Sequence, residues 1–276
     1  MSSSPISVRF WGVRGSIAVG DPAFMRYGGD TICVEVRCGT RVLIFDAGSG
    51  IRVLGNQLVR DGHQNFDLFF SHAHFDHVEG IPFFYPLYRP GCEVRVWSGH
   101  LNQAGATKRF FEGLMVQPYF PVGPERWNAE VRYQDFQQTE TLKPYEGITI
   151  KTFGLTHPGG ATGYRIEHGG RTVCLMFDHE HAAEGPEAGL IEFVRHSDLM
   201  VFDAMYTDAE YPNYVGFGHS TWEQGVRICK AANVSQLAAM HHRPLRTDEE
   251  FDALQLKLDA EMPGSLFARQ GMELTV

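Results

Sequence analysis

The sequence predicts an α/β fold in which two β-sheets pack face to face and helices cover their outer faces, a four-layer αββα sandwich. Apolar and alternating stretches of strand length recur along the 276 residues. Amphipathic stretches of helix length separate them, most regularly after residue 186. No repeat, low-complexity tract or linker interrupts the pattern. We therefore expect one domain that spans residues 1–276.

Composition and charge narrow the class of protein. The chain is 43% hydrophobic and 21% charged, which is typical of a soluble globular protein with a large core. Its formal net charge of −9 argues against a broad basic surface for nucleic acid. No secretory signal is visible, and no apolar stretch approaches the length of a membrane span. The five scattered cysteines, none in a CxxC pair, indicate buried thiols. We expect a cytoplasmic protein without membrane contact.

The first elements follow from alternation and from turn residues. Residues 6–11 alternate in a strand-like way before a glycine-containing loop. Strands at residues 31–37 and 41–45 flank a CGT sequence at residues 38–40, which is typical of a hairpin turn. The next stretch, to about residue 60, places its apolar residues on one helical face.

The remaining elements follow from the same periodicities. The further strands we expect are at residues 66–70, 92–97, 129–133, 148–154, 162–167, 171–177, 198–202, 236–240, 266–268 and 272–275. The further helices are at residues 101–114, 186–195, 221–232 and 248–260. Gly169-Gly170 indicates a two-residue hairpin turn. Ser220, or else Thr221, is placed to cap the helix at residues 221–232. Tyr119-Phe120 lies in a proline-bounded loop, either as a pocket wall or as ordinary packing.

A dense histidine cluster directly follows the apolar strand at residues 66–70. The sequence SHAHFDH at residues 71–77 holds three histidines and one aspartate. Neutral imidazole and carboxylate suit zinc and similar divalent metals. A solvated loop is the alternative, but the density of the cluster and the apolar sequence on both sides favour metal ligands. The candidate ligands are His72, His74, Asp76 and His77.

Further candidate ligands stand where other apolar strands end. His157, Asp178 and the pair His241-His242 each follow such a strand. Any one of them could be an ordinary loop histidine or a capping aspartate. A catalytic zinc needs about three protein ligands, and a paired site about twice as many, so the first cluster alone is too small. A histidine or aspartate directly follows an apolar strand at four places in the chain. This repetition indicates that these residues belong to one shared site.

The cluster resembles the HxHxDH signature of the metallo-β-lactamase-fold hydrolases, and His157, Asp178 and His241 resemble later ligand motifs of that superfamily. This resemblance, from residue 8 to residue 244, implies the metallo-β-lactamase fold. It also implies two divalent metal ions, zinc by default, with manganese or iron as alternatives. It assigns His72, His74 and His157 to one ion, Asp76, His77 and His241 to the other, and Asp178 to a bridge. It also favours His241 over His242.

Two later stretches resemble the ribonuclease Z and phosphodiesterase branch. In that branch an acid and the histidine of a His-Ser-Thr triplet assist departure of the leaving group, and the resemblance gives these roles to Asp203 and His219. The chain differs from ribonuclease Z, which carries His and Glu at positions 202 and 203. It also has no basic insertion like the arm that grips tRNA. Residues 10–16 and 27–31 resemble bacterial hydrolases related to phosphonate-pathway cyclic phosphodiesterases. Arg14 in this opening is either a phosphate contact or a surface residue.

The resemblance implies a dinuclear hydrolase that cleaves a small phosphodiester. A metal-bridging hydroxide would be the nucleophile, oriented by Asp76, and His219 held by Asp203 would assist the leaving group. A long structured nucleic acid is not expected as a partner, and a homodimer is left open. One alternative is hydrolysis of a lactone, thioester or β-lactam on the same metal core. The other is a non-catalytic sensing or binding module, for which the ligand set is unexpectedly complete.

Overall fold

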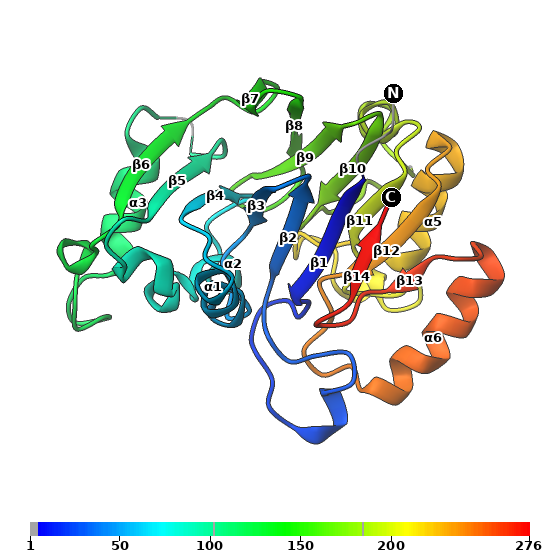
Figure 1. The fold of residues 1–276 in the computed structure, drawn as a ribbon. Coiled ribbons are helices and arrows are strands. Elements are labelled where there is room, and N and C mark those ends of the chain that lie inside the picture. The colour runs from blue at the N-terminus through cyan, green and yellow to red at the C-terminus, as the bar shows by residue number, and fades with distance from the viewer. Residues whose placement is uncertain (1–4, 102, 184) are drawn as a thin grey trace.

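The computed structural model describes residues 5–101, 103–183 and 185–276. These residues form two seven-stranded sheets that pack face to face, with helices on the outer face of each (Figure 1). The strand orders are β14-β1-β2-β3-β4-β5-β6 and β13-β12-β11-β10-β9-β8-β7. The predicted αββα sandwich is confirmed.

The elements have the following bounds. The first sheet contains β1 (Ile6–Gly12), β2 (Cys33–Cys38), β3 (Arg41–Phe45), β4 (Asn65–Phe70), β5 (Glu93–Ser98), β6 (Glu130–Asp135) and β14 (Glu273–Thr275). The second contains β7 (Thr141–Tyr145), β8 (Ile148–Leu155), β9 (Ala161–His168), β10 (Arg171–Met176), β11 (Leu199–Asp203), β12 (Gln236–Met240) and β13 (Leu266–Phe267). The α-helices are α1 (Ile51–Arg60), α2 (Phe75–Val78), α3 (Ala106–Leu114), α4 (Ala188–Val194), α5 (Trp222–Ala232) and α6 (Asp248–Glu261). Short 3-10 helices are η1 (Pro22–Phe24), η2 (Ile81–Phe83), η3 (Tyr85–Tyr88), η4 (Pro124–Arg126) and η5 (Tyr211–Asn213).

The two sheets share one apolar core. The ring of Phe45 on the first sheet lies 5.1 Å from that of Tyr164 on the second, and the Tyr164 hydroxyl donates to the backbone carbonyl of Phe70. A second cluster joins the first sheet to α1 and α3, and a third joins the other sheet to α4, α5 and α6. Because both sheets bury their inner faces against each other, neither can form its core alone.

Parallel strands bring the site residues to one edge of the sandwich. In the first sheet β3 and β4 are parallel, with Phe45 beside Phe69. In the second sheet β10, β11 and β12 are parallel, with Asp203 beside Met240. Parallel strands point the same way, so the loops at their carboxyl ends meet at a common edge. The histidine cluster follows β4, and Asp178 and His241 follow β10 and β12.

Several boundaries differ from the sequence-based predictions. Strand β7 was not predicted, because it is short, contains Pro144 and lies at the edge of its sheet, where proline is tolerated. Helix α3 begins at Ala106 rather than residue 101, since Gly105 adopts a left-handed conformation that interrupts the helix. The N-cap of α5 is Thr221, whose hydroxyl accepts from Gln224 N at 3.0 Å. Of the two predicted candidates for the cap, Thr221 is therefore confirmed and Ser220 was wrong.

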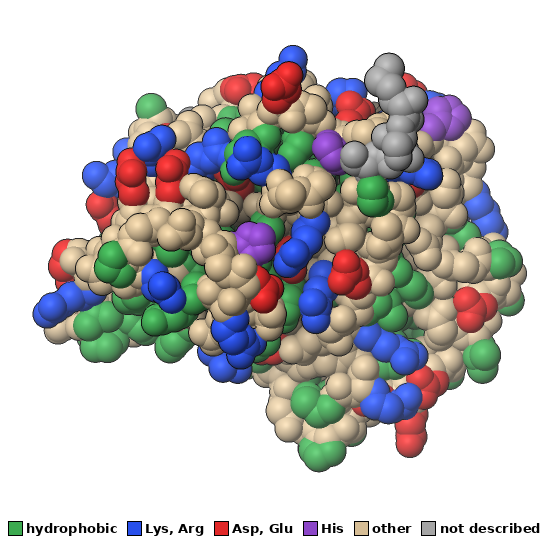
Figure 2. Space-filling model, in the orientation of Figure 1, with side chains coloured by type: hydrophobic (Ala, Val, Ile, Leu, Met, Phe, Trp, Pro, Cys, Tyr) green, Lys and Arg blue, Asp and Glu red, His purple; other side chains and the backbone are tan. Residues whose placement is uncertain are grey.

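The predicted hairpin turn and the predicted buried thiols are confirmed. Gly169 and Gly170 both have positive φ and join β9 to β10 in a two-residue turn. All five cysteines are free and buried. None of the helices in the described ranges is both long and apolar enough to cross a membrane. On the face in Figure 2, basic and acidic side chains are interspersed.

Candidate metal centre and active site

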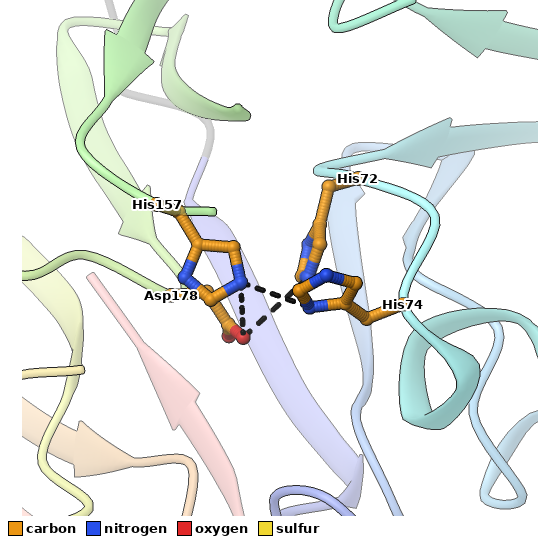
Figure 3. Close-up of side chains that lie close together, drawn as sticks. All are labelled: His72, His74, His157 and Asp178. Carbon is orange, nitrogen blue, oxygen red and sulfur yellow. Dashed lines mark hydrogen bonds and ion pairs between the residues drawn. The ribbon is translucent and has the colours of Figure 1, made fainter. Parts of the chain in front are cut away.

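One group of potential metal ligands joins the two sheets. His72 and His74 come from the loop after β4, His157 from the loop after β8, and Asp178 from the end of β10 (Figure 3). Each offers a ligand atom, and these atoms all lie within 4.8 Å of one another. Asp178 Oδ2 lies 3.6 Å from the Nε2 atoms of His72 and of His157. His74 Nδ1 lies 2.9 Å from His157 Nε2.

A second group lies directly beside the first. Asp76, His77 and His241 also offer ligand atoms within 4.8 Å of one another. Asp76 Oδ2 lies 3.4 Å from His77 Nε2 and 3.2 Å from His241 Nε2. Asp178 Oδ1 lies 3.3 Å and 3.1 Å from the same two nitrogens. The two oxygens of Asp178 therefore face different groups, as a bridging carboxylate would.

The inner atoms of these groups suit a cation. His72 Nε2, His77 Nε2 and Asp178 Oδ1 are buried and have no hydrogen-bond partner among the residues that the structure describes. Buried polar atoms are seldom left unpaired, and each such atom needs an explanation, of which an ion is one. Imidazole nitrogens with carboxylate oxygens form a donor set that divalent metals such as zinc accept. The residues present therefore fit a pair of divalent ions.

Outer contacts orient the histidines toward the centre. His77 Nδ1 donates to Asp46 Oδ2 at 2.8 Å, and His157 Nδ1 donates to the Gly218 carbonyl at 2.7 Å. Asp46 also accepts from the backbone N–H and hydroxyl of Ser71. A proton held on Nδ1 leaves the Nε2 lone pair free to face a metal, which is the usual function of such contacts.

Three residues at this edge adopt a left-handed backbone conformation. Asp46, Asp178 and His241 have φ values of 59°, 49° and 61°, and each lies at the end of a strand. Non-glycine residues rarely adopt positive φ, and such strained positions cluster at functional sites. The turn redirects each side chain from the strand into the space between the sheets.

Three histidines of the cluster favour the neutral form that binds metals. Burial lowers the pKa values of His72, His74 and His157, which favours the neutral imidazole that binds metals. Burial on its own lowers the pKa of His77 too, but Asp178, Asp76 and Asp46 raise it well above its ordinary value, so this ring must release a proton when a metal binds. Burial on its own raises the pKa of Asp178, but the nearby histidines, His241 foremost, lower it well below its ordinary value. Asp178 is therefore ionised.

His219 and Asp203 lie beside the cluster, as predicted. His219 Nδ1 is 2.9 Å from Asp203 Oδ2 and 3.9 Å from Asp178 Oδ2. Burial on its own lowers the pKa of His219, but Asp203, with help from Asp178 and Asp76, raises it to about 9. His219 is therefore protonated at neutral pH and could donate a proton. Asp203 Oδ1 also lies 4.0 Å from His241 Nδ1.

The choice between His241 and His242 follows from where each ring points. His241 Nε2 faces Asp76 and Asp178. His242 is fully buried, and its Nε2 donates to the carbonyl of Ala268 at 2.7 Å. His242 therefore packs in the interior, and His241 is the member of the pair that faces the cluster.

Arg14 is neither a phosphate contact nor a surface residue, so both interpretations of it were wrong. It is fully buried, and its guanidinium donates to backbone carbonyls, including those of Gly28 and Arg246. It joins the loop after β1 to the loop after β12. In the Tyr119-Phe120 loop, the Phe120 ring packs against Phe83 at 5.9 Å, whereas Tyr119 is 84% exposed.

Sequence reasoning missed two residues that organise the site. Asp46 directly follows β3 and orients His77, but the sequence pattern marks it only as the residue at which a strand ends. Glu180 lies two residues after Asp178 and accepts from the backbone N–H groups of Gly216 and Gly218 at 2.6 and 2.7 Å. An acidic residue directly after a strand was the only signal for Asp46. No local signal identified Glu180.

Comparisons with known proteins agree with this fold. The family model described as the beta-lactamase superfamily domain matches residues 40–242. Ribonuclease Z of Gemmatimonas aurantiaca is 24% identical over an alignment that covers 98% of this chain and 96% of that protein. The metallo-beta-lactamase fold protein YhfI of Bacillus subtilis has a TM-score of 0.75 at 17% identity, covering 99% of this chain and all of that one. A diphosphatase from the PhnP family has a TM-score of 0.71 at 17% identity, covering 99% and 97%.

The chain belongs to the beta-lactamase superfamily and is a metal-dependent hydrolase. The family match covers more than half of the chain and includes both the cluster after β4 and His241.

Proposed function

We propose that the protein is a dinuclear metal-dependent phosphodiesterase that acts on a small organic phosphodiester. The observation that carries this proposal is the position of His219, held by Asp203 beside the cluster of metal-ligand residues. Cleavage of an ester with a poor alkoxide leaving group gains from a proton donor placed there, whereas lactone or thioester hydrolysis does not require one. Relatives named ribonuclease Z and a PhnP-family diphosphatase support a phosphate-containing substrate.

The ligand assignment follows the two groups of side chains. We assign His72, His74 and His157 to one ion, Asp76, His77 and His241 to the second, and Asp178 to a position between them. Zinc is the first choice for this donor set, with manganese or iron as alternatives. When bound, two divalent ions polarise the phosphoryl oxygens and make hydroxide available near neutral pH.

The protein's own side chains orient the reactants. The backbone N–H of Ser16 donates to Asp76 Oδ2 at 2.7 Å and fixes that carboxylate, which we propose orients the attacking oxygen. His219 holds one ring proton against Asp203 through Nδ1, so that Nε2–H is the group that donates to the departing alkoxide. A positioned acid of this kind contributes about 10²–10⁴-fold in rate.

The test compares two leaving groups in His219→Ala. p-Nitrophenolate departs without protonation, whereas an alkoxide does not. We expect the variant to keep its metal content, to lose about tenfold in kcat on bis(p-nitrophenyl) phosphate, and to lose about 10²–10⁴-fold on a dialkyl phosphodiester. His63→Ala is the matched control, since His63 precedes β4 at the opposite end of that strand. Equal losses on both substrates would overturn the role of His219. Absence of diester turnover in the metal-loaded wild-type protein would overturn the proposed function.

A further inference from the structure

The arginines on the segments that form the site are already engaged by the protein. Six segments bring the site residues together: 13–20, 71–79, 156–160, 178–187, 203–221 and 241–246. Their Lys and Arg residues are Arg14, Arg243 and Arg246. Arg14 is buried against backbone carbonyls. Arg243 donates to Glu210 at 3.0 Å and to the Tyr214 hydroxyl at 2.8 Å, and Arg246 also pairs with Glu210. A protein that grips a polyanion needs cations that can neutralise its phosphates. These segments do not offer them.

Large apolar side chains on the same segments are exposed instead. Phe75 is 70% exposed and stands between His74 and Asp76 in the chain. Phe217 is 60% exposed and lies two residues before His219. An exposed apolar side chain next to a polar site is typical of a place where an apolar ligand binds.

The loop that contains Phe217 is held in place. Its backbone N–H groups at Gly216 and Gly218 donate to Glu180. The Tyr214 ring stacks on the buried Tyr206 ring at 4.3 Å and 6°, and lies 5.7 Å from the Phe217 ring. The Tyr206 ring in turn lies 6.2 Å from that of His219. A series of ring contacts therefore connects the proposed proton donor, through the buried Tyr206 and through Tyr214, to the exposed Phe217. A fixed surface loses little conformational entropy when a ligand binds.

We propose that the exposed side chains of Phe75 and Phe217 form a subsite for an aromatic organic group of the substrate, and that Tyr214, covered by Tyr206 and by the Arg243 guanidinium, supports Phe217 from behind. This inference rests on the proposed function and narrows it. The substrate is a small phosphodiester with an aryl or nucleobase group, and the phosphate alone supplies its charge. Stacking of an aromatic group on such side chains is worth about 1–3 kcal/mol, or roughly 5–150-fold in affinity.

The probes are phenylphosphonate and methylphosphonate. They share the phosphonate group, and phosphorus carries an aromatic ring in the first and a methyl group in the second. Calorimetric titration of the metal-loaded protein measures binding without turnover. We expect phenylphosphonate to bind at least about tenfold more tightly than methylphosphonate. This preference should fall by about fivefold or more in Phe217→Ala and in Phe75→Ala. Leu256→Ala is the control, since Leu256 is 73% exposed on the distant helix α6.

Three results would overturn the subsite. The first is equal affinity for the two phosphonates, and the second is a phenyl preference that survives both phenylalanine substitutions. The third is tight, strongly salt-dependent binding of a structured precursor tRNA, which would require the polyanion contacts argued against above. If bis(p-nitrophenyl) phosphate is hydrolysed while any of these holds, the subsite fails and the phosphodiesterase function stands.

Discussion

At the scale of single residues, Asp178 is the point where the two groups of proposed ligands meet. Its two oxygens face different groups, each within 3.6 Å of two histidine nitrogens. Asp178→Asn keeps the shape but removes the charge and replaces one oxygen with a donor. We expect metal content, measured by elemental analysis, to fall from about two ions per chain to fewer than one. His63→Ala should retain both ions. Two bound ions in Asp178→Asn would contradict the bridging assignment.

Glu223 gives a residue-scale prediction about pH. Burial, with Asp208 nearby, raises its pKa to about 7 from an ordinary 4.5. The folded protein therefore holds this proton to a higher pH than the unfolded chain. The resulting stabilisation is fully present below pH 4.5 and is lost as pH rises through 7.

Glu223→Gln, which cannot ionise, tests this effect. We expect the variant to match wild type at about pH 4.5 and to exceed it by about 1–2 kcal/mol at about pH 8, allowing for partial solvent exposure of the carboxyl group. Urea unfolding at both pH values measures the difference. Glu249→Gln, in the first turn of α6, is the control. A difference that does not change with pH would contradict the raised pKa.

At the scale of elements, Glu180 links the end of β10 to the loop that contains His219. Its carboxylate accepts two backbone N–H groups of that loop, and the Gly218 carbonyl accepts from His157. Glu180 is thus a positioning residue for both the proposed proton donor and a proposed ligand. In Glu180→Gln one oxygen becomes a donor that opposes one of these N–H groups. Hydrogen bonds to a charged group are worth about 1.5–3 kcal/mol, so we expect roughly a 10–100-fold loss of kcat.

Comparing the loss of kcat on two substrates shows whether Glu180 positions His219 or only supports the fold. The loss in Glu180→Gln should be larger for a dialkyl diester than for bis(p-nitrophenyl) phosphate, the pattern expected of His219→Ala, at unchanged metal content. Glu192→Gln, an exposed position on α4, should lose neither. A uniform loss on both substrates would mean that Glu180 does not act through His219.

The elements that deliver the ligands could be predicted from sequence because their strands are buried on both faces. Strands β4, β10 and β12 therefore read as apolar runs, and a histidine or aspartate directly after such a run stands out. Edge strand β7 lacks this signal. Asp46 contacts a histidine that lies 31 positions further along the chain, and Glu180 contacts a glycine 38 positions further along. Only the folded chain creates these contacts. The orientations of His241 and His242 likewise depend on packing and not on local pattern.

At the scale of the whole molecule, the proposed metal centre lies where the two sheets meet and takes ligands from both. The loop after β4 in the first sheet supplies four of the proposed ligands, and the second sheet supplies the other three. The sheets also share the core that contains Phe45 and Tyr164. Bound ions would therefore stabilise the contact between the two halves as well as each half. This shared centre is the physical reason why we still predict a single domain for residues 1–276.

This arrangement predicts a single cooperative unfolding transition that depends on metal. A ligand at about a thousand times its Kd stabilises the folded state by about 4 kcal/mol, which for a chain of this size corresponds to a rise in Tm of roughly 5–15 °C. We expect calorimetry to show one transition in both forms, shifted down by that amount after treatment with a chelator. Asp178→Asn should remove most of the shift, because neither group of ligands is complete without the bridge. Two transitions, of which metal moves only one, would mean that the halves unfold independently and that the ligands do not span them.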